Sequence, residues 1–186
     1  MSQTAFSNAR VAGICGLLAF VTVNLGWIAG GLAQPDAYSV ARDDISDLGA
    51  VTASSSWIYN RIGANLTGLL VVVVALGLWR ALSPSVLGRV GAGALLVAGA
   101  GAILDGFFHL DCRGIDTGCT NDSWHSHAHK IESGITGVAT VATPLILAFA
   151  FRRIPACARP STVGGTYAHV RRRQRQHHRL DAQRDW

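Results

Sequence analysis

Histidines and acidic residues gather in one short stretch of this chain, residues 105–132. The part that follows Ser123 carries His125, His127 and His129. If a helix begins near Ser123, His125 and His129 stand one turn apart on the same face, whereas His127 points elsewhere. Two histidines with this spacing can bind one metal ion, so the pattern predicts a metal site at His125 and His129.

Further ligands and a base lie close by in the sequence. A third ligand could come from His109 or Asp111, and zinc suits such a ligand set. A carboxylate from Asp105, Asp111 or Glu132 could then activate a metal-bound water. The alternative is that these groups are solvated at a membrane surface or form hydrogen bonds with helix ends. Ionisable groups near the interior of a membrane bundle are costly, so this segment is the predicted functional site.

Four apolar runs must position these residues, at about residues 11–32, 62–79, 90–108 and 131–151. A bilayer core of about 30 Å needs roughly 20 helical residues, which these runs approach or reach. The third run qualifies only if its C-terminal end meets the interface or a wet cavity, because Asp105 lies in that end and His109 directly follows it. The predicted fold is an all-α, polytopic transmembrane helical bundle of four spans, formed by residues 1–152.

Composition favours the membrane class over a soluble bundle with very apolar helices. The chain is 49% hydrophobic and 15% charged, and its 21 glycines fall largely inside the apolar runs. Small residues let helices approach closely in lipid. A cleaved secretory signal is the alternative for residues 11–32, but this run is longer than the roughly 7–15 apolar residues of a signal peptide.

The charges between the runs alternate in sign. Arg10 precedes the first run, Arg80 and Arg89 flank the link between the second and third, and an arginine-rich tail follows the fourth. The other two connections are acidic. Lysine and arginine prefer the cytoplasmic side, so both termini are expected inside and both acidic loops outside. We therefore predict a multi-pass protein of the cell membrane, in contact with the lipid bilayer.

The tail from Arg152 onward holds nine arginines against two aspartates, a net charge of +7, while the rest of the chain carries −2. A charge run of this kind is usually a solvated segment. Residues 153–186 are thus predicted to be a disordered, basic cytoplasmic tail. No folded basic face accompanies the run, so no nucleic-acid partner is expected.

Two cysteines, Cys112 and Cys119, fall in the same predicted outer loop. Outside the cytoplasm, thiols this close together can oxidise, so we expect a Cys112–Cys119 disulfide. Two free thiols are the alternative. A metal-binding pair is less expected because the spacing is not that of a zinc-binding C-x₂-C motif.

Several short motifs resemble a known family: Ile45-Ser46-Asp47-Leu48-Gly49, Trp57, Asn60, Gly63, Phe108-x-x-Asp111 and His125-x-x-x-His129. They are similar to motifs of the bacterial membrane proteins catalogued as "domain of unknown function 998", over about residues 10–152. The resemblance implies a polytopic helical membrane protein. The positions that match the family pattern are Ser46, Gly49, Asn60, Asp111, His125 and His129.

The chain departs from this family in two ways. Members usually have a proline where this chain has His109, which argues against a shared role for that histidine. Members also commonly have about six spans, whereas this chain continues into an arginine-rich segment at residues 171–179 that is too polar to enter lipid. A frame shift near Ala156 is our hypothesis for this difference, with a natural four-span protein as the alternative.

The layout also resembles, more distantly, the membrane hydrolases that include alkaline ceramidases. That likeness would make His125 and His129 zinc ligands, Asp111 a ligand or base, and Ser46 a further catalytic residue. It implies a metal-dependent hydrolase of lipid-like esters or amides.

Two other functions stay open. One is a non-catalytic scaffold or accessory subunit, whose outer loops bind a membrane partner protein or a second copy of the chain. The other is a small transporter, in which Asn24, Asn65 and Asp105 line a polar path.

Overall fold

The computed structural model describes residues 3–35 and 38–153 of the chain. The chain divides into two units, Met1–Ala150 and Phe151–Trp186. The first unit is helical, and no strand occurs in the described ranges. Beyond Arg153, the predicted tail and the hypothetical frame shift near Ala156 lie outside the described residues.

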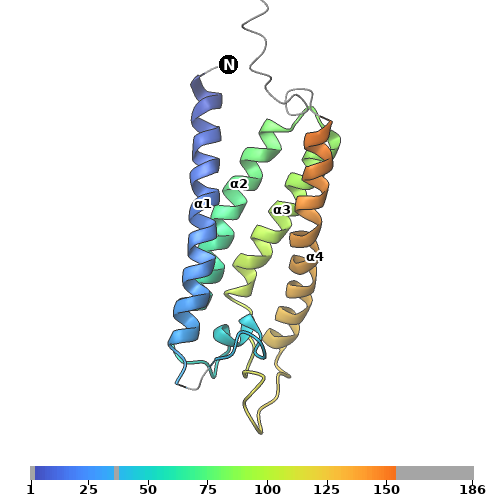
Figure 1. Ribbon diagram of the computed structural model, residues 1–186. Helices are drawn as coiled ribbons and strands as arrows, with labels where there is room; N and C mark the ends of the chain where they lie inside the picture. The colour runs from blue at the N-terminus through green and yellow to red at the C-terminus, as the bar shows by residue number, and fades with distance from the viewer. Residues whose placement is uncertain (1–2, 36–37, 154–186) are drawn as a thin grey trace, which may run out of the picture. The chain divides into compact units, whose positions relative to one another are not determined.

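Four long helices run alternately up and down through the first unit, as Figure 1 shows. They are α1 (Gln3–Leu32), α2 (Thr67–Ala81), α3 (Val86–Asp105) and α4 (Trp124–Arg152). The helical segments long and apolar enough to cross a membrane are Arg10–Leu32, Ile58–Ala81, Val86–Asp105 and Trp124–Arg152. The predicted all-α bundle with four spans is therefore confirmed.

Large apolar side chains cover the outward faces of these helices. Phe20 on α1 is 66% exposed and Val138 on α4 is 72% exposed. Such faces are unfavourable in water but are the normal lipid-facing surface of a membrane helix. The protein is accordingly a multi-pass membrane protein.

Three helix ends differ from the apolar runs. The second span begins at Ile58 rather than near residue 62, and α4 begins at Trp124 rather than near residue 131. The third helix ends at Asp105 instead of near residue 108. Hydropathy marks the part of a helix that lies in lipid, whereas a helix continues into the interface as long as its polar side chains find partners.

Arg61 shows how one such extension is possible. Its guanidinium NH1 donates to Asn65 Oδ1 over 2.8 Å, and its Cζ lies 5.1 Å from the centre of the Phe107 ring. The side chain itself is exposed. The uncharged run begins after Arg61, but the helical span includes this charge and begins earlier, at Ile58.

The second span opens with a π-helical segment, η2 (Ile58–Leu66). Its wide turns bury Tyr59, Asn60 and Gly63. A Cβ added at Gly26 of α1 would overlap the backbone of Gly63, so α1 and η2 cross at two glycines. This close approach is the packing that small residues allow between membrane helices.

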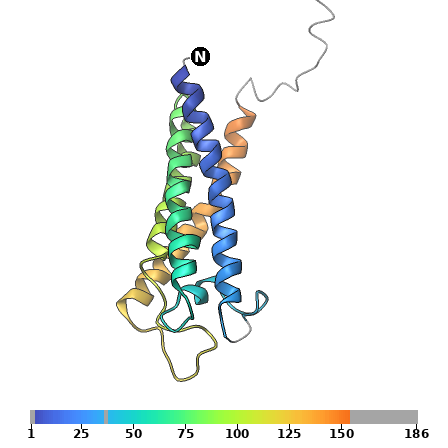
Figure 2. The ribbon, with the colours of Figure 1, turned by 90° about the vertical axis from the view of Figure 1, so that its left-hand side faces the viewer.

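The described parts of the two acidic loops, residues 33–35 and 38–57 in the first and 106–123 in the second, lie at the same end of the bundle (Figures 1 and 2). The first contains the short 3₁₀ helix η1 (Ile45–Gly49). The loops are joined by hydrogen bonds from Val51 N to Leu110 O (2.9 Å) and from Gly114 N to Asp47 Oδ1 (3.1 Å). Both loops thus act as one polar layer at that end.

Candidate metal centre

His129 lies one turn into α4 and is only 5% exposed. Its Nδ1 is 3.0 Å from Asp105 Oδ1 and 2.8 Å from the backbone oxygen of Phe108. Both of these oxygens are acceptors, so Nδ1 carries a proton and donates to them when no cation is bound, and it would have to lose that proton to act as a metal ligand itself. The other ring nitrogen, Nε2, is 3.4 Å from Ser133 Oγ. The ring is therefore held in a defined orientation.

Asp105 connects three elements of the bundle. It is the last residue of α3, and its Oδ1 faces His129 of α4. Its Oδ2 accepts a hydrogen bond of 3.1 Å from the hydroxyl of Tyr59, which is buried in η2. Both oxygens of this carboxylate have partners, so its position is fixed by side chains from two other elements.

Glu132 follows His129 by three residues on α4 and is 8% exposed. Its Oε1 accepts a hydrogen bond of 2.5 Å from Thr136 Oγ1. Its Oε2 is buried and has no hydrogen-bond partner among the residues that the structure describes. A buried oxygen without a partner is unusual and often marks an ion or water.

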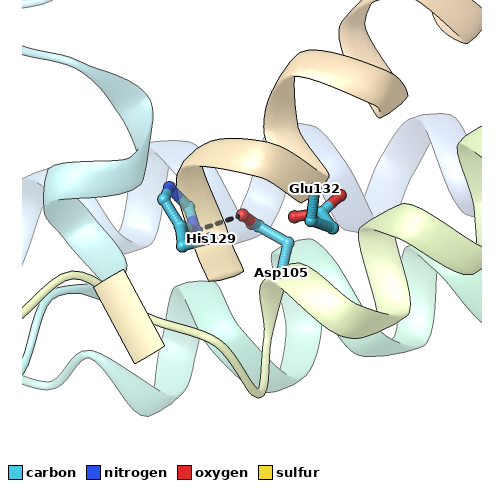
Figure 3. Close-up of side chains that lie close together, drawn as sticks. All are labelled: Asp105, His129 and Glu132. Atoms are coloured by element: carbon cyan, nitrogen blue, oxygen red, sulfur yellow. Dashed lines mark ion pairs between the residues drawn. The ribbon is translucent and has the colours of Figure 1, made fainter. Parts of the chain in front are cut away.

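Asp105, His129 and Glu132 form the three-residue cluster of Figure 3, in which both carboxylates and the imidazole lie together between α3 and α4. Each residue offers one ligand atom, and these atoms all lie within 4.8 Å of one another. Imidazole nitrogen and carboxylate oxygen are ligands that zinc accepts, and catalytic zinc sites use three protein ligands. The donor set and the unpartnered Glu132 oxygen fit a divalent cation.

Gly101 on α3 makes room for this cluster. A Cβ added at Gly101 would overlap Thr136 Oγ1 and come within 2.8 Å of Glu132 Oε1. No side chain larger than hydrogen fits here without moving α4. The glycine therefore lets the two carboxylate-bearing helices approach closely enough to bring the three side chains together.

His125, the other predicted metal ligand, lies outside this cluster. Its ring stacks on that of His109, with centroids 6.0 Å apart and planes 13° apart, and it also contacts Trp124. Burial and the neighbouring His125 lower the pKa of His109, which favours an uncharged ring. His125 Nδ1 is buried and has no hydrogen-bond partner in the described part of the chain. The structure groups His129 with Asp105 and Glu132, whereas His125 pairs with His109.

Asp111 is held at the start of α4. Its Oδ1 accepts from Ser123 Oγ over 2.6 Å, and its Oδ2 accepts from Ser123 N over 3.0 Å. These bonds with Ser123 lower the pKa of Asp111, so the carboxylate stays ionised. Asp111 N also donates to Ser126 Oγ over 2.9 Å. These contacts give Asp111 a role in fixing the position from which α4 begins.

Ser46, the other predicted catalytic residue, lies half-buried in η1. In the described ranges it forms no hydrogen bond with Asp111, His125 or His129. Ser46 and Asp111 are each placed in the polar layer, and the structure does not join them to the cluster.

The loop before α4 is tied together by a disulfide between Cys112 and Cys119. The Asn121 side chain accepts from Cys112 N over 3.0 Å and donates to Cys112 O over 3.1 Å. Cys112 directly follows Asp111, so the disulfide and Asn121 support the same segment that caps α4.

Sequence reasoning named Asp105 and Glu132 as carboxylates that could activate water, and it missed Tyr59. Asp105 and Glu132 could be found because an acidic residue at the end of a membrane span is costly and often functional. Tyr59 gave no such signal, because a tyrosine at a membrane interface is ordinarily an anchor for the helix. Tyr59 lies in η2 and donates to Asp105, a contact between two elements that are distant in the sequence.

Comparison with known proteins identifies a family. The family model described as "Protein of unknown function (DUF998)" matches residues 14–170. No curated protein and no solved structure matches the chain.

Proposed function

The chain belongs to the family described as "Protein of unknown function (DUF998)", and we propose that this member is a metal-dependent hydrolase of lipid-like esters or amides. In this proposal it lies in the cell membrane with both termini in the cytoplasm. The metal ion is zinc or a similar divalent cation, bound by Asp105, His129 and Glu132 at the outer face.

Charge supports this orientation. Each span has one end that joins an acidic loop and one end that does not. The arginines Arg10, Arg80 and Arg89 lie at the ends that do not. The acidic loops are hydrogen-bonded to each other in one layer. Basic residues stay on the cytoplasmic side, so the layer and the cluster beside it belong on the outer side.

The observation that carries the proposal is a pair of carboxylates, the half-buried Asp105 and the buried Glu132, beside one imidazole, with Glu132 Oε2 unpartnered. Two carboxylates this close repel each other unless a proton or a cation lies between them. A bound divalent ion would supply an activated water near neutral pH. Tyr59 orients Asp105, and Thr136 orients Glu132, through the hydrogen bonds that each donates.

The two alternative functions make different demands on the molecule. A scaffold or accessory subunit would co-purify with a membrane partner or a second copy and would not depend on His129. For a transporter, Asn24 and Asn65 would have to face a common path. Instead, Asn24 donates to Phe20 O within α1, and Asn65 donates to Ile103 O of α3. The cluster therefore favours the hydrolase.

Protein purified in mild detergent is expected to contain about one divalent ion per chain, as a catalytic site of three protein ligands would hold. Metal analysis should find this ion in the wild type and in His125→Ala, and not in His129→Ala. Hydrolysis of a long-chain fluorogenic ester or amide should stop on chelation and return when the metal is restored. Metal-free wild-type protein would contradict the proposal, and so would hydrolysis that is insensitive to chelation.

A further inference from the structure

A groove of about 450 Å³ runs between α3 and α4 on the outward face of the bundle. Small residues line part of it, namely Ala100, Gly101 and Ala128. Its walls are apolar and come from both helices, namely Val97, Leu104, Ile131 and Ile135. The volume lies within the roughly 300–1,000 Å³ of ordinary small-molecule sites.

Glu132 and Thr136 also line the groove, part-way along α4 among Ala128, Ile131 and Ile135. Glu132 belongs to the metal cluster as well, so the groove and the cluster share this residue. The groove therefore offers an apolar surface that adjoins one residue of the cluster. A molecule with an apolar chain and a polar linkage matches this pattern.

We infer that the groove between α3 and α4 binds one acyl chain of the substrate and places the adjacent ester or amide at Glu132. This inference rests on the proposed function, because it assigns the chain to the molecule that the cluster would hydrolyse. It adds the route of entry: the substrate comes sideways from the bilayer, since all the lining residues belong to the two candidate spans.

The extent of the groove favours an acyl chain over a helix of a second copy. The lining residues cover 97–104 on α3 and 128–136 on α4, which at 1.5 Å per residue is roughly 12 Å of each helix. A partner helix that crosses a bilayer core of about 30 Å would instead need a surface along the whole span. A flexible acyl chain fits a depression of this length, whereas a helix that spans the bilayer does not.

A fatty acid that carries a diazirine near its methyl end tests this assignment in detergent-purified, full-length protein. Illumination should cross-link the probe to the groove residues of α3 and α4, and this labelling should saturate as probe is added. Exposed residues of α1, such as Phe20, serve as the internal reference for non-specific contact with lipid. Ala100→Phe fills the groove and is expected to lower the saturable labelling by about tenfold or more.

The matched control is Ala29→Phe, which adds the same side chain to an exposed position on α1 and should leave the labelling unchanged. If Ala100→Phe does not fold, Ala128→Leu provides a second way to narrow the groove. Labelling that never saturates, or that follows exposure equally on α1 and α4, would overturn the inference. So would a dimer in solution whose contact covers the groove.

Metal content measured on the same samples separates the two proposals. Saturable labelling in a protein without metal would leave the acyl site standing and remove the hydrolase. Bound metal without saturable labelling would leave the hydrolase proposal standing and remove the acyl site.

Discussion

Glu132→Gln is expected to weaken metal binding by about a hundredfold or more, since even residues that only support a ligand contribute 10–100-fold. The substitution keeps the shape of the side chain and its contact with Thr136 but removes the charge that a cation needs. Competition with a chromophoric chelator measures the affinity directly. The helical content and the thermal transition should stay close to those of the wild type, because glutamine tolerates burial without a counter-charge better than an anion does.

His125→Ala is the control for this prediction, because His125 stacks on His109 and lies outside the cluster. It should retain the affinity of the wild type. If His125→Ala loses the metal while Glu132→Gln retains it, the site is the His125–His129 pair that the sequence spacing predicted, and the cluster does not bind the ion.

Gly101→Ala is expected to lower both metal affinity and thermal stability. Its new methyl group would overlap Thr136 Oγ1 and press on Glu132, so α3 and α4 must separate. Overpacking of this kind typically costs about 1–3 kcal/mol. Metal titration together with a thermal melt in detergent reports both effects. Since one displacement causes both, they should appear together.

Two further variants make this prediction specific. Gly134→Ala lies on α4 with nothing within 4 Å of the added Cβ, so it should leave affinity unchanged and slightly raise stability. Adding Thr136→Ala to Gly101→Ala removes the hydroxyl that the methyl group meets and should restore part of the stability. A Gly101→Ala protein with normal stability and normal metal affinity would show that the two helices do not depend on this glycine.

The spans were predictable because each depends on a property of one continuous segment. An uncharged run of about 20 residues is typical of a helix that crosses a membrane. The signs of the flanking charges then predicted that both acidic loops lie on the same side. The residues at which the helices begin were harder to predict. Arg61 directly precedes the second apolar run, yet it lies inside the helical segment η2, because Asn65 and Phe107 accommodate its guanidinium.

The composition of the site was harder to predict, because it depends on where two helices meet. The spacing of four residues correctly placed His125 and His129 on one face, yet the two rings meet different neighbours. His125 sits at the helix start, where Trp124 and His109 surround it. His129 lies one turn further along and meets Asp105 at the end of α3. That meeting depends on the close packing of α3 and α4, for example of Gly101 against Thr136, which no local sequence pattern encodes.

X-ray absorption at the zinc edge of zinc-loaded protein tests the central claim most directly. If Asp105, His129 and Glu132 hold the ion, the spectrum will show a single imidazole and otherwise oxygen ligands at about 2.0–2.2 Å. Two imidazoles in the coordination sphere, or a chain that takes up no zinc at all, would contradict the account.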